Sequence, residues 1–138
     1  MSFDERAELA PGYTISRVIR GGWQLAGDHG EVARDAVNDD LAAFYDAGIT
    51  TFDCADIYTG VEEMYGDFRA ALLQKRGAGA LAQLRIHTKY VPDLDALATL
   101  TAADVRRTID RSLQRLRMER LDLVQFHWWD YDQPRWRE

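Results

Sequence analysis

Residues 51–60 read TFDCADIYTG, and this stretch decides the fold of the chain. Its first half continues an apolar run that predicts a short buried strand over residues 49–55, and the threonine and glycine that end it predict a turn. Asp53 and Tyr58 lie five residues apart at the carboxyl end of this strand. Because a charged carboxylate is costly to bury without a partner, Asp53 requires a cation nearby.

Outside this stretch the chain alternates strands with helices. Residues 1–14 are polar, and we expect a flexible, irregular lead-in there. Residues 15–138 are expected to form one unit. Apolar periodicity predicts strands over 15–23, 49–55, 84–90 and 121–128, and helices over 31–47, 61–75 and from Thr101 onward, where Asp104 completes a capping box. No hairpin signal is evident, so this alternation of strands and helices predicts parallel strands joined by crossover helices.

Each predicted strand carries a polar face near its carboxyl end, because residues two apart share a face. Asp53, Lys89 and His127 occupy these positions on three successive strands. In an open sheet with helices on both sides, these side chains would lie under a helix. In a (β/α)8 barrel, they would line the mouth, where active sites are built. The sequence therefore predicts an α/β fold, a partial TIM barrel of about four β/α units.

The residue types in this ring suit proton transfer to oxygen. A lysine beside a phenol stabilises the phenolate and lowers the tyrosine pKa from about 10, so Tyr58 could donate a proton at neutral pH. A neutral His127 could hydrogen-bond a substrate oxygen that gains charge when a carbonyl accepts hydride. No metal site is expected, because the metal-binding spacings of histidine are missing from the sequence. The competing interpretation is a buried Asp53–Lys89 pair beside an unrelated tyrosine and histidine.

Composition excludes several classes of protein. With 138 residues, 46% of them hydrophobic, the chain can form one domain with a core. Its net charge of −6 argues against a nucleic-acid or anionic-membrane binder. Cys54 is the one cysteine of the sequence, so an internal disulfide is excluded, and this cysteine content is typical of a cytoplasmic protein. Because Cys54 lies within a predicted strand, we interpret it as a small buried hydrophobe rather than a nucleophile. The arginine run over residues 106–117 is interpreted as a solvated face rather than an anion site. No signal peptide or apolar run of ~18 residues is present, so we expect no membrane association.

Five segments together resemble the N-terminal part of an aldo-keto reductase. They occur in the order that the family has, and the resemblance covers residues 15–130. The segments are GGW at 21–23, GITTFDCADIY at 48–58, EEMYG at 62–66, TKY at 88–90 and LDLVQFHW at 121–128. The resemblance implies a (β/α)8 barrel that reduces a small aldehyde or ketone with NADPH.

The resemblance also implies roles for individual residues. Tyr58 would be the proton donor, Lys89 and Asp53 would lower its pKa, and His127 would orient the substrate carbonyl. By the same resemblance, Gly22, Trp23 and Asp53 would contact the cofactor, and Trp23 and Trp128 would line the substrate pocket. The alternative for both tryptophans is that they only pack in the fold.

The sequence departs from the family pattern in two respects. Thr59 is inserted where the family has glycine directly after the tyrosine. The sequence also holds four β/α units, whereas a barrel needs eight and ~250 residues. In the family, the second half of the barrel holds the nicotinamide ring and the phosphates of NADPH. The sequence also has no Gly-x-Gly-x-x-Gly fingerprint that could bind these phosphates instead. We therefore expect reductase ancestry, with little or no activity in the chain alone.

Other functional classes stay open. The chain could be a non-catalytic barrel fragment or binding subunit, or the product of a truncated gene. A four-stranded parallel sheet leaves two open edges, so a homo-oligomer joined through these edges is also expected.

Overall fold

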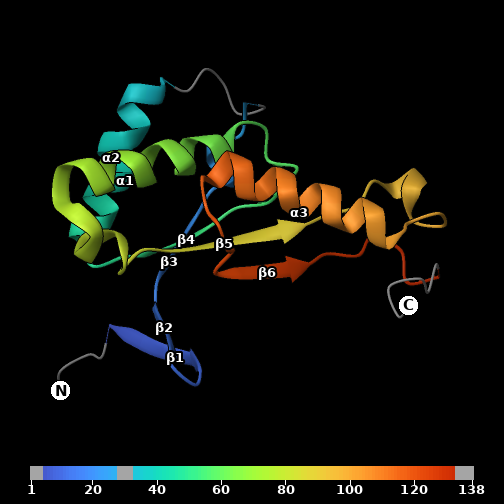
Figure 1. The fold of residues 1–138 in the computed structure, drawn as a ribbon, viewed down its shortest axis with the longest axis horizontal. Coiled ribbons are helices and arrows are strands. Elements are labelled where there is room, and N and C mark those ends of the chain that lie inside the picture. The colour runs from blue at the N-terminus through green and yellow to red at the C-terminus, as the bar shows by residue number, and fades with distance from the viewer. Residues whose placement is uncertain (1–4, 28–32, 133–138) are drawn as a thin grey trace.

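The computed structural model describes residues 5–27 and 33–132 of the chain. Its main feature is a four-stranded parallel sheet in the order β3-β4-β5-β6, with each strand beside the one before it in the sequence (Figure 1). Crossover helices α1, α2 and α3 join these strands, as the sequence predicts. The strands span Ile19–Gly21, Thr51–Asp53, Arg85–Tyr90 and Leu123–Phe126, and the helices Arg34–Asp46, Val61–Leu81 and Ala102–Leu116.

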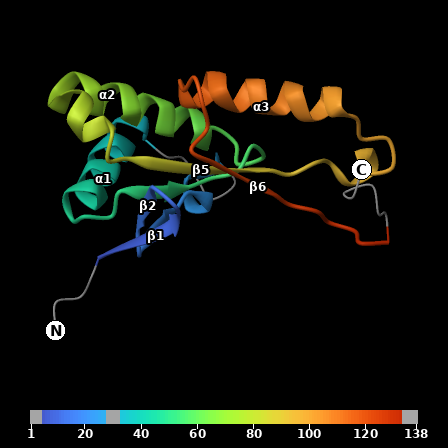
Figure 2. The same ribbon diagram turned by 60° about the horizontal axis from the view of Figure 1, so that its bottom comes forward.

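The helices pack on one face of the sheet, and α2 and α3 run side by side along it (Figure 2). The core forms between this face and the helices. Phe52 and Cys54 of the β4 segment are fully buried there, together with Ile86 of β5. Cys54 is thus a small buried side chain, as the sequence predicts, and burial raises the pKa of its thiol. The same face of β6 is less covered, because Val124 and Phe126 are 40% and 50% exposed.

Local chemistry explains where α2 and α3 begin and end. The predicted capping box at the start of α3 is confirmed, since Thr101 N donates to Asp104 Oδ2 at 2.8 Å and Asp104 N donates to Thr101 Oγ1 at 3.3 Å. A break in α2 occurs at Gly77, which has a φ of 80° and lies just after the predicted end of this helix. The helix then resumes and ends at Leu81, so its predicted end at residue 75 is too early.

The expectation of an irregular segment before residue 15 is wrong for residues 6–14, and residues 1–4 lie outside the part of the chain that the structure describes. Strands β1 (Arg6–Ala10) and β2 (Tyr13–Ser16) form an antiparallel hairpin instead. Pro11-Gly12 supplies the turn, with Gly12 at a φ of 75°. The predicted continuous strand over 15–23 is therefore divided between β2, which belongs to the hairpin, and β3, which belongs to the sheet.

Candidate active site

A short ion pair joins the ends of β4 and β5. Lys89 Nζ lies 2.5 Å from Asp53 Oδ2, and both side chains are largely buried, with exposed fractions of 17% and 25%. Lys89 Nζ also donates to the backbone oxygen of Cys54 at 2.8 Å, and Gln125 Nε2 donates to Asp53 Oδ1 at 3.2 Å. Each charge therefore has two partners, which fixes the ammonium group in position.

Tyr58 lies beside this pair, in the loop that leads from β4 into α2. Its backbone is held in a turn, because Tyr58 N donates to Ala55 O and Val61 N donates to Tyr58 O. Lys89 Nζ lies 5.5 Å from the centroid of the Tyr58 ring, which is within the range of a cation–π contact. The structure thus brings together three of the four residues that the sequence predicts for the catalytic site.

His127 follows β6 at the same end of the sheet. Its backbone N–H donates to Tyr90 O at 2.9 Å and extends the pairing with β5 by one residue. Its ring packs edge-on against Trp129, with 4.5 Å between the ring centroids. Within residues 5–27 and 33–132, no hydrogen bond or ion pair joins the His127 ring to Asp53, Tyr58 or Lys89. Sequence reasoning missed Trp129 as the neighbour of this histidine.

The predicted binding residues lie in different surroundings. Gly22 ends the β3 segment in a crowded position, where a Cβ atom would come within 2.8 Å of Asp53 O and Tyr65 Oη. Trp23 begins the short helix η1 (Trp23–Leu25) and is 56% exposed. Trp128, in contrast, is buried; its ring contacts Phe126 and its Nε1 donates to Asp130 O at 2.6 Å. Trp128 therefore lies beside Phe126, whose side chain is on the helix-facing side of β6.

Residues 17–137 match the model of the aldo/keto reductase family. The chain belongs to this family. It is 37% identical over 120 residues to a 6-dehydroglucose reductase of Novosphingobium aromaticivorans, an alignment that covers 84% of this chain and 38% of that protein.

Solved aldo-keto reductase structures have the same fold. One from Pseudomonas aeruginosa is 28% identical, with a TM-score of 0.71, over 91% of this chain and 47% of that one. One from the silkworm Bombyx mori is 27% identical, with a TM-score of 0.69, over 89% of this chain and 36% of that one. The chain therefore spans less than half the length of these relatives. The predicted α/β fold, a partial TIM barrel, is confirmed.

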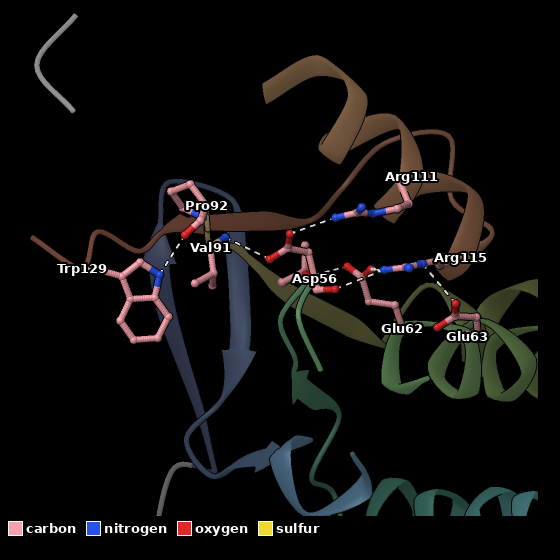
Figure 3. A network of polar contacts seen from close by, with 9 residues as sticks. Asp56, Glu62, Glu63, Val91, Pro92, Arg111, Arg115 and Trp129 are labelled. Atoms are coloured by element: carbon pink, nitrogen blue, oxygen red, sulfur yellow. Dashed lines mark hydrogen bonds and ion pairs between the residues drawn. The ribbon is translucent and has the colours of Figure 1, made fainter. Parts of the chain in front are cut away.

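This aldo-keto reductase chain also contains a buried polar network that sequence reasoning did not find, and Figure 3 shows it. Asp56 is its centre. Its N–H donates to Lys89 O at 3.0 Å, and its Oδ1 accepts from Val91 N at 2.9 Å. Arg111 pairs with its other carboxylate oxygen at 3.2 Å. Burial raises the pKa of Asp56, and these bonds hold the loop that carries Tyr58 against the end of β5.

A second carboxylate, Glu62, extends the network into α2. It is fully buried and accepts a hydrogen bond from Thr88 Oγ1 at 2.8 Å. Arg115 Nη1 lies 3.3 Å from Glu62 Oε2, donates to Asp56 O at 3.1 Å, and its Nε pairs with Glu63 at 3.0 Å. The prediction that the arginines of α3 face water is therefore wrong for Arg115, which is only 30% exposed.

Two further properties concern the part of the chain that the structure describes. No group of three or more His, Cys, Asp or Glu side chains there is arranged to hold a metal ion. None of the helices described is both long enough and apolar enough to cross a membrane.

Proposed function

We propose that this chain supplies the proton-transfer residues of an NADPH-dependent aldo-keto reductase that reduces a small aldehyde or ketone to an alcohol. The observation that carries the proposal is the position of Lys89, whose ammonium group pairs with Asp53 at 2.5 Å and lies 5.5 Å from the ring of Tyr58. Family membership supports the reaction class.

In the proposed reaction Tyr58 donates its hydroxyl proton to the oxygen of the carbonyl group. A fixed cation beside the ring stabilises the phenolate that remains, and Lys89 is suited to this role because Asp53 and Cys54 O hold it in place. His127 would donate a hydrogen bond to the same substrate oxygen and orient it. Its side chain is exposed and packs edge-on against Trp129.

The cofactor NADPH would supply the hydride. The residues at the carboxyl ends of β3 and β4 fit the nicotinamide end of this molecule, since an exposed indole and a carboxylate suit a ring and sugar hydroxyls. Trp23, with Gly22 before it, and Asp53 would hold that end. Trp23 would also contact the substrate. Trp128 would reach the substrate only after leaving its buried position beside Phe126. The phosphates of NADPH would be held outside these residues.

The replacement Tyr58→Phe tests this proposal. NADPH consumption with an aldehyde substrate would be followed for the chain alone and for the chain joined to the remaining barrel segment of a relative. We expect the rate to fall by ~10²–10⁴-fold while NADPH binding survives, because only the acidic proton is lost. Tyr131→Phe, at a ring that is 73% exposed, is the matched control. A Tyr58→Phe protein that keeps more than a tenth of the rate would refute the assignment.

A second candidate is a binding subunit or barrel fragment without turnover. The exposure of Val124 and Phe126 on β6 favours it, because such a surface suits contact with another polypeptide. An NADPH titration separates the candidates, since only the reductase requires the cofactor. A cytoplasmic location belongs to both proposals, because the single thiol, Cys54, is free.

A further inference from the structure

A cavity of about 640 Å³ lies at the opposite end of the sheet from Lys89. Arg85, the first residue of β5, and Asp122, just before β6, both line it, so it opens at the amino ends of these strands. Residues of α2 and of the connection from α3 to β6 form its other walls. The cavity is therefore separate from the candidate active site.

Arg69 lines this cavity with a partly buried guanidinium group. Its Nε is buried and has no hydrogen-bond partner, and the side chain forms no hydrogen bond or ion pair with the residues that the structure describes. Burial lowers the pKa of Arg69, and Asp122 opposes this shift only as a more distant charge. This guanidinium is therefore partly desolvated and has no ion-pair partner among the described residues, so the position favours an incoming anion.

Arg85 offers a second donor that is already fixed in place. Its Nη1 donates to Ala82 O at 2.7 Å and to Leu84 O at 3.0 Å, and its guanidinium carbon lies 5.6 Å from the centroid of the Tyr13 ring. Its Nε is nevertheless buried and unpaired among the described residues. A ligand that binds the guanidinium group of Arg85 from the cavity would lose little free energy in ordering this side chain, because the bonds of Nη1 already order it.

The chemistry of the walls defines the ligand. Three arginines and two carboxylates line the cavity, which gives a net positive charge, and one of the carboxylates, Asp122, already accepts from Ile86 N at 2.9 Å. Leu81 and Met118 add apolar surface. We propose that this cavity binds a small organic anion, whose carboxylate or phosphate group contacts Arg69 and Arg85 and whose carbon chain lies against the apolar wall.

Calorimetric titration with two probes at constant ionic strength tests the proposal. Inorganic phosphate represents the phosphate group, and hexanoate represents a carboxylate with a carbon chain. We expect at least one to bind the parent chain, and Arg69→Gln to weaken that binding by about tenfold or more. The matched control is Arg106→Gln, on the exposed side of α3, which should bind as the parent does. Tighter binding of hexanoate would identify carboxylates as the ligand class, and tighter binding of phosphate would identify phosphate esters. Failure of both probes to bind the parent, or equal binding by Arg69→Gln, would overturn the proposal.

Thermal unfolding in anion-free buffer provides a second test that does not depend on a probe. Arg69→Met removes a partly buried charge that has no ion-pair partner among the described residues, and it leaves an apolar side chain of similar length. We therefore expect its Tm to equal or exceed that of the parent. A lower Tm would show that a group of the protein already compensates the charge of Arg69, and would contradict the proposal.

Discussion

Replacement of Arg115 by methionine should destabilise the fold more than any surface ion pair could. It leaves the Glu62 carboxylate, which is 1% exposed, with only the hydroxyl of Thr88, and it removes the donor to Asp56 O. Loss of one partner of a buried pair costs ~3–5 kcal/mol. Because Arg115 itself is 30% exposed, water can replace part of the contact, which favours the lower value of about 3 kcal/mol. For a chain of this size that loss corresponds to a fall in Tm of roughly 10 °C.

Urea and thermal unfolding, followed by circular dichroism, would measure this loss. The matched control is Arg107→Met, because Arg107 is 70% exposed and its pair with Asp104 should contribute at most ~1 kcal/mol. A double-mutant cycle with Glu62→Gln then isolates the pair. The neutral amide still accepts from Thr88, so in its background the loss from Arg115→Met should shrink by about 2 kcal/mol. If Arg115→Met costs no more than Arg107→Met, the buried network does not stabilise the fold and the reasoning fails.

Three further predictions address other parts of the fold. Gly66→Ala should lower the free energy of unfolding by at least about 3 kcal/mol, because the added Cβ would overlap the backbone oxygen of Arg115. Gly79→Ala, which has open space around it, should not destabilise the fold, and urea unfolding would compare the two proteins. Burial lowers the pKa of His87 from 6.5, so the unfolded chain binds a proton more readily. The free energy of unfolding should therefore fall as the pH drops below about 6.5. If a His87→Gln protein keeps the same dependence, His87 is not its cause. We also expect the purified chain to self-associate through β3 and β6, whose outer edges have no strand partner in the described part of the chain. Sedimentation that shows a compact monomer with cooperative unfolding would contradict this expectation.

Much of the sheet could be predicted from the sequence because its signals are local. The alternation of side chains in β4 and β5 places Asp53 and Lys89 on one face, and the register of the structure pairs these strands as parallel neighbours. The capping box of α3 involves residues only three apart. Such features depend on adjacent residues, so sequence reasoning finds them without knowledge of the tertiary structure.

The buried network could not be found in this way, because its partners come from distant segments. Arg115 meets Glu62 and Asp56 across more than fifty residues of sequence. Helical periodicity assigns such an arginine to the border of the apolar stripe, where it can face either water or a neighbouring helix. The direction of the His127 ring is likewise set by contact with Trp129, and alternation along the strand cannot specify a rotamer.

The hydrogen bonds of Asp56 have a consequence for the motion of Tyr58. Loops commonly open at low free energy, independently of the sheet that they connect. Here Asp56 N donates to Lys89 O and Val91 N donates to Asp56 Oδ1, so the start of this loop is bonded to the end of β5 and to the residue that follows it. Local opening would have to break these buried bonds. The amide protons of Asp56 and Val91 should therefore exchange with solvent as slowly as those of the sheet, and the tyrosine two residues further on should move with β5.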